Sequence, residues 1–539
     1  NLPRISEVSL QKRIRQQTLK NMAYDILIQG GEVLDGDSKG SKITDIGIKG
    51  DKIVGIGTFS ITGAKTIIKA EGCYVTPGFI DMSNHSDTHL TFFRYPRLES
   101  IAMQGVTTIV GGNCGASLAP LASPEAIHAV DKWADVSTIN VNWNTMEEYL
   151  DEMEKLKFGV NYATFVGYGT LRRGVIGNEI RPLTLEEREK LKFLLRESIG
   201  QGAYGLSLGL AYGHERISSS EEIIDVVRAI KGTRVLLKIH LRSEGAELLG
   251  AINEAIHIGR ESELSIQISH LKAIGKKTWP LFIKGLEMIS RARTSGMNIH
   301  FDVSPFNATG SLLYLLIPAW ARHGGFIELF KKIDDVVLYT KIIAELNRLT
   351  LHYDRILVTS AKTATVVGKT IQEIADEMNI PPAEALVRLV RVNEGRVSMV
   401  GRTLSRQNME RGIIHEASYV ASDGEGYDQI EFESGNLAHP RSFGAFPHFW
   451  HFFVSDFSKM MPHEAITKIT SGPARALGLV GRGVLKVGNI ADIAVFDKRL
   501  FKDRATYRNP YRYPAGISAV MINGSLVVHE GMHTGVRVG

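Results

Sequence analysis

The sequence predicts a (β/α)8 barrel of the TIM type and a small β-sandwich domain formed by both chain ends. Three observations lead to this fold class. The middle of the chain alternates short apolar strands with helical patterns, eight such strands are found there, and both ends consist of strand patterns separated by tight turns. A chain of 539 residues accommodates this combination, because single barrels often exceed the usual domain size of about 150 residues.

The β-domain is expected to combine residues 23–75 with residues 470–539. The N-terminal part contains YDILIQGGEV and DIGIKGDKIVGIG, whose apolar runs are broken by Gly-Gly and Lys-Gly-Asp turns. The C-terminal part contains DIAVFD and then VMINGSLVV, in which Asn523-Gly524 is a strong hairpin signal. Two strand-rich ends that flank a long middle therefore predict one domain shared by both termini.

Residues 76–469 are assigned to the barrel. Thr184 and Glu187 form a capping-box pattern ahead of one of its helices. The long gap between the last two strands is expected to be an insertion over the barrel mouth, at about residues 305–416. The eight expected strands are residues 75–82, 106–111, 160–167, 203–208, 235–240, 265–270, 297–303 and 418–423.

The composition excludes several classes of protein. Hydrophobic residues make up 44% and charged residues 22%, as in ordinary globular proteins, and no apolar run reaches the length of a membrane span. The net charge of +5 is spread over the chain without a Lys/Arg block, which argues against nucleic-acid binding. Two cysteines exclude a disulfide scaffold and favour the cytoplasm. Residues 1–22, basic and polar, are expected to be a disordered extension or a cloning remnant.

Potential metal ligands follow three of the expected barrel strands. Cys114 comes just after the second strand, His240 ends the fifth and His270 ends the sixth. In such a barrel the functional side chains lie at these strand ends. A thiolate and two imidazoles suit zinc and leave a fourth position for a water molecule, whose pKa falls to about 7. Each residue alone is more often structural, but their joint pattern at strand ends favours a zinc site.

Acidic residues follow the same edge of the expected barrel. Asp81 lies near the end of the first strand, Asp302 in the seventh and Asp423 at the end of the eighth. An aspartate beside the zinc site would accept a proton from water and pass it to a leaving amine.

Several segments resemble the N-acyl-D-amino-acid deacylases, or D-aminoacylases, of the amidohydrolase superfamily. The motifs GNCG, HLRSEG and ISHLK occur in this order and are specific to that family, and the resemblance covers about residues 24–535. Further matching segments are PGFID, VGYGTLRR, GAYGLSLGL, ASDG, HPRSFGAFP, SGPARALGL and GNIADIAVFD.

The resemblance implies roles for six residues. It implies that zinc is held by the cysteine of GNCG and the histidines of HLRSEG and ISHLK, which are Cys114, His240 and His270. It implies that Asp423 of ASDG is the catalytic acid and base. It also implies that Lys272 and Arg441 hold the carboxylate of the substrate, for which Arg offers a bidentate contact and Lys a point charge. The other interpretation of these two cations is a pair of solvated surface charges.

The sequence departs from the family pattern at two places. The family has a His-x-His pair after the first strand, whereas this chain has Ser83-Asn84-His85, so a second metal site at His85 and Asp423 would be weak. We therefore expect one Zn²⁺ per chain, with His85 beside the metal or bonded to the reacting groups. Tyr168 replaces the histidine of the VGHGT segment. Ser83, Tyr168 and Phe306 are candidate residues of the substrate pocket.

The predicted function is zinc-dependent hydrolysis of N-acyl-D-amino acids to a carboxylate and a free D-amino acid. The alternatives are a different C–N or ester hydrolysis, or an isomerisation, on the same barrel, and a metal-free scaffold descended from such enzymes. The stretches FGAFPHFWHFF and SLLYLLIPAW either line an apolar pocket or pack in the core, and core packing is favoured. The sequence leaves open the acyl group, the side chain, the stereochemistry and the oligomeric state.

Overall fold

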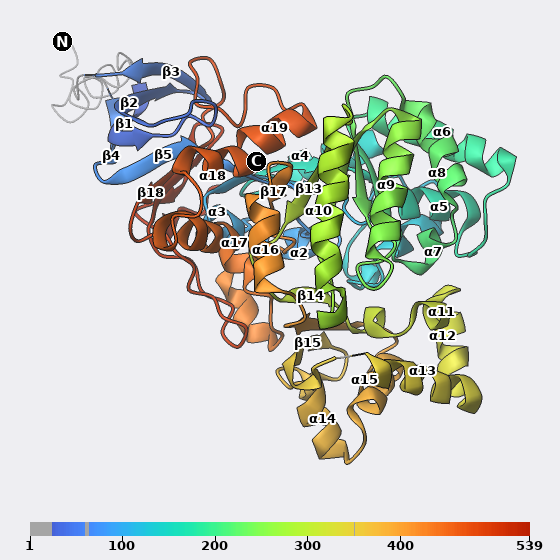
Figure 1. Cartoon of the computed structure of the whole chain (residues 1–539). Coiled ribbons are helices and arrows are strands. Elements are labelled where there is room, and N and C mark those ends of the chain that lie inside the picture. The colour runs from blue at the N-terminus through green and yellow to red at the C-terminus, as the bar shows by residue number, and fades with distance from the viewer. Residues whose placement is uncertain (1–23, 60–63, 350) are drawn as a thin grey trace, which may run out of the picture.

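A computed structural model describes residues 24–59, 64–349 and 351–539 of the chain. The expected leader, residues 1–22, lies outside these described residues. The fold has three parts, namely a barrel of parallel strands covered by helices, a β-domain that joins the two chain ends, and a mixed insertion (Figure 1).

Short parallel strands form the wall of the barrel. One sheet has the order β17-β13-β12-β11-β10-β9 and a second has the order β6-β7-β8, and a parallel bridge between Asn84 and Gly424 links the segments that follow β6 and β17. The expected strand 160–167 is interrupted at Phe165 between β8 and β9. The barrel strands are β6 (Phe79–Asp81), β7 (Val106–Gly111), β8 (Asn161–Thr164), β9 (Val166–Gly167), β10 (Gly205–Gly209), β11 (Leu236–His240), β12 (Ser265–Ile268), β13 (Ile299–Val303) and β17 (Ser418–Val420).

Helices connect the barrel strands and cover their outer side. Helix α6 begins after Thr184, whose hydroxyl accepts from the amide of Glu187 in the predicted capping box. The helices are α2 (Thr91–Arg94), α3 (Glu99–Ala102), α4 (Met146–Leu156), α5 (Tyr168–Ile176), α6 (Leu185–Gly200), α7 (Gly213–Arg216), α8 (Ser220–Val227), α9 (Leu248–Ser262), α10 (Trp279–Thr294), α16 (Arg406–Ile414), α17 (Arg441–Trp450), α18 (Pro462–Ile469) and α19 (Ser471–Leu477).

The β-domain joins the two ends of the chain in one sheet. The path runs β21-β20-β19-β18-β5-β1-β2-β3, and β4 pairs with β1. The predicted hairpin turn is present, with Asn523 at φ 50° and Gly524 at φ 75°. The strands are β1 (Tyr24–Val33), β2 (Lys42–Lys49), β3 (Lys52–Gly57), β4 (Ala64–Lys69), β5 (Cys73–Pro77), β18 (Ile493–Asp497), β19 (Ile517–Ile522), β20 (Ser525–His529) and β21 (Met532–His533).

The expected strand 75–82 is divided between two domains. Its first part belongs to β5 of the β-domain, and its second part is β6 of the barrel. Gly78 separates the two, and a Cβ at this position would lie 2.2 Å from the side chain of Thr107. The close approach of the two chain segments at Gly78 therefore marks where the chain passes from one sheet to the other.

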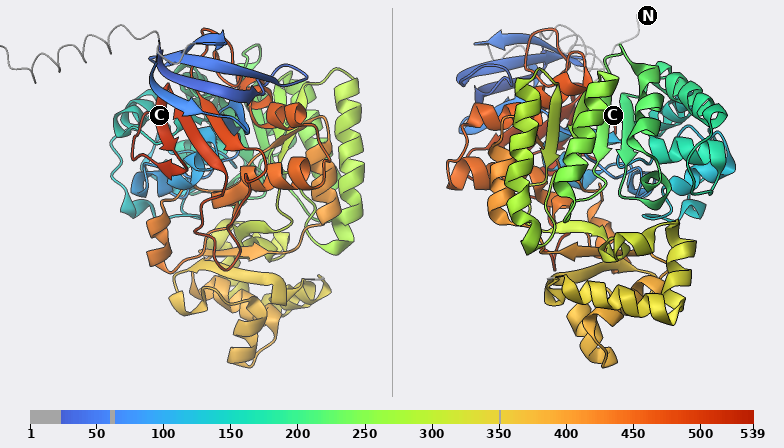
Figure 2. Two further views of the ribbon diagram at one scale, coloured as in Figure 1. Left: turned by 90° about the vertical axis from the view of Figure 1, so that its left-hand side faces the viewer. Right: turned by 45° about the vertical axis from the view of Figure 1, so that its right-hand side comes forward.

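A mixed insertion lies between β13 and β17. Its three strands have the order β14-β16-β15, and helices pack beside them at the end of the barrel away from β1–β3 (Figure 2). The elements are β14 (Thr309–Leu312), α11 (Ala319–Arg322), α12 (Gly325–Asp334), α13 (Val336–Arg348), β15 (Ile356–Ala361), α14 (Ile371–Met378), α15 (Pro382–Val392) and β16 (Val397–Gly401).

Most of the aromatic stretch FGAFPHFWHFF (residues 443–453) packs in the core, as the favoured interpretation had it. It forms α17 and a π-helical turn (His451–Asp456). Phe446 stacks on Phe79 at 5.7 Å between ring centroids, and Trp450 meets Tyr74 edge-on at 5.4 Å. These rings join the barrel to the β-domain sheet.

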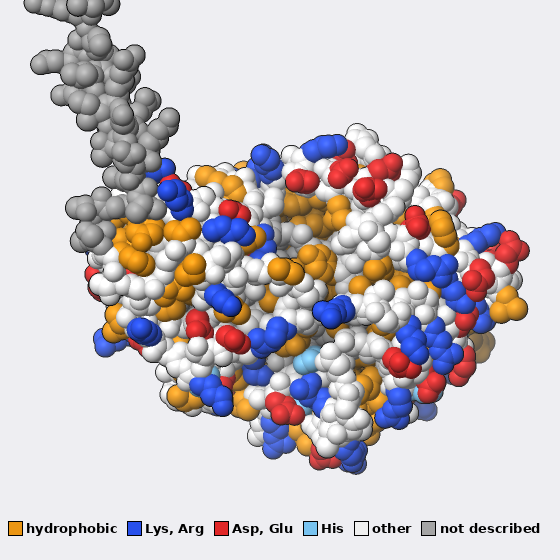
Figure 3. All heavy atoms as spheres, turned by 90° about the horizontal axis from the view of Figure 1, so that it is seen from above, with side chains coloured by type: hydrophobic (Ala, Val, Ile, Leu, Met, Phe, Trp, Pro, Cys, Tyr) orange, Lys and Arg blue, Asp and Glu red, His pale blue; other side chains and the backbone are white. Residues whose placement is uncertain are grey.

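The surface seen from above carries charges of both signs. Lys and Arg side chains alternate there with Asp and Glu, and apolar side chains lie between them (Figure 3). Within the described residues, the helices are all too short or too polar to cross a membrane.

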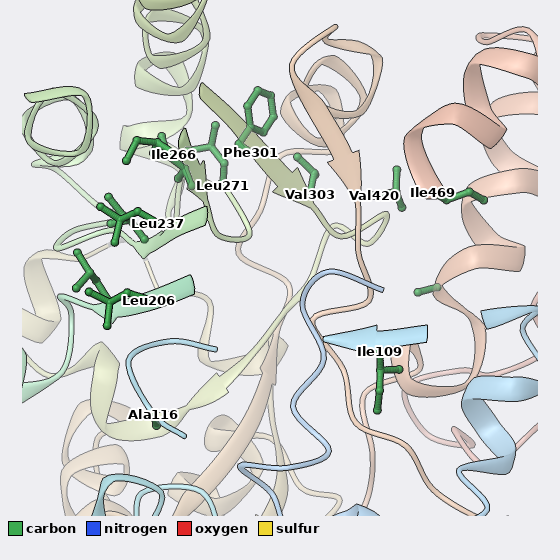
Figure 4. Close-up of a cluster of buried hydrophobic side chains, with 14 of the residues drawn as sticks. Ile109, Ala116, Leu206, Leu237, Ile266, Leu271, Phe301, Val303, Val420 and Ile469 are labelled. Atoms are coloured by element: carbon green, nitrogen blue, oxygen red, sulfur yellow. The ribbon is translucent and has the colours of Figure 1, made fainter. Parts of the chain in front are cut away.

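Side chains of the central barrel strands alternate between an apolar outer side and a polar interior. The outward side chains belong to the buried hydrophobic cluster drawn in Figure 4 and include Leu206, Leu237, Ile266 and Phe301. Their neighbours in sequence are fully buried as well but polar, and they are Ser207, Lys238, Gln267 and Asp302. The barrel interior beneath the site is thus a polar network enclosed by an apolar layer.

Candidate metal centre and active site

Cys114, His240 and His270 converge at one end of the barrel. The ligand atoms of the three buried residues all lie within 4.8 Å of one another. The Sγ of Cys114 is 3.3 Å from Nδ1 of His240 and 3.4 Å from Nε2 of His270. His240 ends β11, whereas the other two residues follow β7 and β12, so three strand ends build the cluster.

The three side chains fit a zinc ion. A tetrahedral zinc with Zn–S near 2.3 Å and Zn–N of about 2.0–2.1 Å separates sulfur and nitrogen by about 3.5 Å, close to the separations found here. Burial opposes ionisation of Cys114, but His240 and His270 outweigh it and hold the pKa of the thiol well below its usual value. Cys114 is therefore present as a thiolate, the form that binds a metal. The structure thus supports a metal site at this cluster.

Three site residues adopt a left-handed backbone conformation. The φ angles are 54° at Cys114, 35° at His270 and 57° at Asp423. Residues with a Cβ seldom adopt positive φ, and such outliers are often found at functional sites. The strand-to-loop turns that aim these side chains are therefore strained.

Glu244 contacts the outer side of the metal cluster, a role that the sequence analysis did not assign. Its Oε1 lies 3.1 Å from Nδ1 of His270 and 4.0 Å from Nε2 of His240, the ring nitrogens that face away from Cys114. A carboxylate in this place fixes the tautomer and the orientation of a ligand histidine. The only signal in the sequence is an acid four residues after His240 in HLRSEG.

Asp423 lies between a guanidinium and an imidazole. Its Oδ2 accepts from Nη1 of Arg441 at 2.6 Å, and its Oδ1 is 3.4 Å from Nε2 of His85. Burial raises the pKa of the Asp423 carboxyl, but nearby positive charges lower it more. Arg441 is the largest of these, and the pKa lies well below its ordinary range. Asp423 is therefore an anion at neutral pH.

His85 connects Asp423 with the metal cluster. Its Nε2 is also 3.9 Å from Sγ of Cys114, and its Nδ1 is 3.1 Å from the hydroxyl of Thr88. Burial lowers the pKa of this imidazole, but Asp423 and Cys114 reverse the effect and raise it to about 10. The structure thus places His85 beside both the metal ligands and the predicted acid and base.

The two cations predicted to hold a carboxylate both reach the site. Nζ of Lys272 is 2.6 Å from Oε1 of Glu244 and 2.8 Å from Nδ1 of His270, and Arg441 pairs with Asp423 as described. Both side chains are largely buried, so they are not solvated surface charges.

A cavity with about 160 Å³ of space for the centres of water-sized molecules opens above the cluster. Metal-cluster residues form its base, and residues of β14, β15 and β16 line the other side, so the insertion covers the barrel mouth. Phe306, a predicted pocket residue, instead lines a smaller side cavity together with His270, Lys272 and Arg441.

Ser83 and Tyr168 do not line this cavity, which corrects the prediction for both. The hydroxyl of Ser83 accepts from Nζ of Lys238 at 2.7 Å, and this buried ammonium lies 3.5 Å from Asp302. The hydroxyl of Tyr168 donates to Glu222 at 2.9 Å within α5 and α8. Both hydroxyl groups are hydrogen-bonded to buried partners outside the cavity lining.

Comparison with known proteins finds a matching family model and similar enzymes. A model described as "Amidohydrolase family" matches residues 443–528. The chain is 29% identical to the D-aminoacylase of Alcaligenes xylosoxydans xylosoxydans over 96% of this chain and 97% of that one. It is 30% identical to the N-acyl-D-glutamate deacylase of the same organism, over 93% of both chains.

Solved structures of the same kinds of enzyme are similar to this chain. A D-aminoacylase with a binuclear metal centre, in which one metal activates and the second attenuates, matches with a TM-score of 0.81 and 28% identity over 96% of this chain and 99% of that one. The N-acyl-D-glutamate deacylase of Bordetella bronchiseptica, in complex with zinc and a phosphonate inhibitor, matches with a TM-score of 0.80 and 26% identity over 96% of this chain and all of that one. The chain therefore belongs to the N-acyl-D-amino-acid deacylase family of the amidohydrolases.

Proposed function

We propose that this chain hydrolyses the amide bond of N-acyl-D-amino acids, with zinc, to a carboxylate and a free D-amino acid. The observation that carries the proposal is the placement of the metal cluster in one cavity with the anionic Asp423 and the cations Lys272 and Arg441. Similarity to D-aminoacylase and to N-acyl-D-glutamate deacylase supports the substrate class.

Asp423 is assigned the role of acid and base. Zinc at the cysteine and two histidines supplies a Lewis acid that polarises a carbonyl and makes water a stronger acid. The carboxylate of Asp423, kept ionised beside Arg441, accepts the proton of the attacking water. It then passes this proton to the nitrogen of the scissile amide, so that the D-amino acid leaves as an amine.

His85 is assigned to positioning and charge stabilisation. With Nδ1 at Thr88 and Nε2 toward Asp423, the ring is held against the carboxylate. An imidazolium in this buried place also stabilises negative charge that develops on the substrate oxygen.

Lys272 and Arg441 are assigned to the α-carboxylate of the substrate. Both are paired with acids of the site, Glu244 and Asp423, at 2.6 Å. Such pairs hold the two cations in place in the cavity before the substrate arrives, which lowers the cost of ordering them on binding.

We infer one zinc per chain. At the position where the family has the first histidine of its pair, Ser83 accepts from Lys238, whose buried ammonium opposes a second divalent cation nearby. The one group of possible metal ligands found within the described residues is Cys114, His240 and His270. One-metal activation of the similar D-aminoacylase supports a functional site with a single ion.

A substrate panel tests the proposal. The zinc-loaded chain is assayed with N-acetyl derivatives of D- and L-methionine, with the ethyl ester of N-acetyl-D-methionine and with a lactone. We expect release of D-methionine from the D-amide and much slower hydrolysis of the L-amide. Preferred hydrolysis of the lactone, or no amide hydrolysis by a zinc-loaded sample, would contradict the proposal.

A further inference from the structure

Carboxylates outnumber cations in the lining of the main cavity. The acids are Glu244, Asp423, Glu425 and Glu431, whereas Lys272 and Arg441 are the Lys and Arg side chains among the described lining residues. A bound Zn²⁺ and the Cys114 thiolate add one net positive charge, and the His85 imidazolium adds another. The lining as a whole is therefore close to neutral, and the question is where an acid in it lacks a nearby Lys or Arg.

Each of the two cations is already paired with an acid of the site. Lys272 lies 2.6 Å from Glu244, and Arg441 lies 2.6 Å from Asp423. The proposed function assigns both cations to the α-carboxylate of the substrate. A second carboxylate on the substrate would find no further Lys or Arg in the described lining.

Glu425 is the acid of this lining that lacks a cationic partner of fixed charge. It is buried, its Oε2 accepts from the hydroxyl of Ser442 at 2.8 Å, and its Oε1 is 3.4 Å from Nε2 of His89. Burial lowers the pKa of His89 to about 4, so this ring is neutral near pH 7. Glu431, by contrast, contacts Arg94 at 3.5 Å.

The position of Glu425 brings its charge close to the carboxylate-binding end of the cavity. It follows Asp423 by two residues, and its backbone amide donates to the hydroxyl of Ser442, the neighbour of Arg441. Burial raises the pKa of Glu425, but His89, Arg441 and the Ser442 hydroxyl together lower it below its ordinary value. A substrate anchored at Arg441 therefore brings its remaining groups near a carboxylate that has no Lys or Arg in contact with it.

We infer, on the basis of the proposed function, that the cavity accepts N-acyl-D-amino acids with neutral or positively charged side chains and excludes those with a second negative charge, and that Glu425 determines this preference. A second carboxylate would lose its water without gaining a cation and would be repelled by Glu425. Specificity of this kind rests on a repulsive element against the wrong substrate. The chain would then differ from the similar N-acyl-D-glutamate deacylase in the charge of its substrates.

A matched substrate pair tests the inference. N-acetyl-D-glutamine and N-acetyl-D-glutamate have nearly the same shape and differ by one negative charge. We expect kcat/KM for the amide to exceed that for the acid by at least about 100-fold in the zinc-loaded wild-type chain. E425Q should reduce this ratio at least about tenfold, whereas the control E433Q, which removes an exposed acid outside the cavity lining, should leave it unchanged.

The outcomes separate this inference from the proposed function. If no N-acyl-D-amino acid is hydrolysed, the proposed function fails. If N-acetyl-D-glutamine is hydrolysed and N-acetyl-D-glutamate reacts equally well or faster, only the charge inference is overturned. An unchanged ratio in E425Q refutes the role of Glu425. If E425Q is inactive, the Kd values of D-glutamine and D-glutamate are measured by calorimetry for the variant and for wild type. A ratio of the two Kd values that is the same in both proteins refutes the role of Glu425.

Discussion

Replacement of Glu244 by glutamine should weaken zinc binding without removing a ligand. The carboxylate of Glu244 lies 3.1 Å from Nδ1 of His270. In E244Q this charge-assisted contact is replaced by a contact to a neutral amide. Contacts to charged groups contribute about 1.5–3 kcal/mol and neutral ones about 0.5–1.5 kcal/mol, so the loss is about 1–1.5 kcal/mol. His240, at 4.0 Å, adds less. The sum predicts zinc affinity lower by about tenfold, at the lower end of the usual range for partners of ligand histidines.

Competition with a chromogenic chelator at neutral pH measures this effect directly. Zinc Kd is determined for wild type, E244Q and the control E261Q, which removes an exposed carboxylate of α9 that pairs with Arg228 far from the cluster. The control should bind zinc like wild type. A Kd for E244Q within twofold of wild type would refute the argument that Glu244 supports the ligand histidines.

Three further predictions concern the metal and Asp423. C114A should abolish both zinc binding, measured by elemental analysis after dialysis, and hydrolysis; full activity would overturn the ligand assignment. R441Q should raise the depressed pKa of Asp423, so that the acid limb of the kcat profile moves to higher pH, because the base is protonated sooner as pH falls; an unmoved limb would exclude this coupling. The double variant S83H/K238M should bind close to two zinc ions per chain where wild type binds one, and a stoichiometry still near one would show that Ser83 and Lys238 do not limit the count.

The fold and the central residues of the site could be predicted because they follow from local patterns. Parallel strands of a barrel place their carboxyl ends at one edge, so Cys114, His240 and His270 had to meet if the strands were placed correctly. Asp423 reached the same edge by the same rule. The strand boundary was missed although Pro77-Gly78 interrupts the apolar residues on either side, and the structure divides the strand there, where Gly78 packs closely against Thr107.

The supporting residues could not be predicted because their partners are distant in sequence. Lys238 lies within the apolar run LLKIH, and nothing local shows that its ammonium reaches Ser83, 155 residues away. Tyr168 looked like a pocket residue because of its motif, but Glu222, 54 residues later, accepts from its hydroxyl. Glu244 needs the turn after β11 to bring its carboxylate to His270. Such contacts depend on the geometry of loops, which residue spacing does not determine.

Strained turns position two of the proposed metal ligands and the proposed acid–base residue. Cys114, His270 and Asp423 all have positive φ, a conformation that costs about 1 kcal/mol or more for a residue with a Cβ. Glycine would remove this cost at each position but would also remove the thiolate, the imidazole or the carboxylate. Each of these residues follows the end of a barrel strand by two or three positions, and all three line the same cavity. The fold therefore retains strain at the positions whose chemistry needs it, and the apolar layer between strands and helices offsets it.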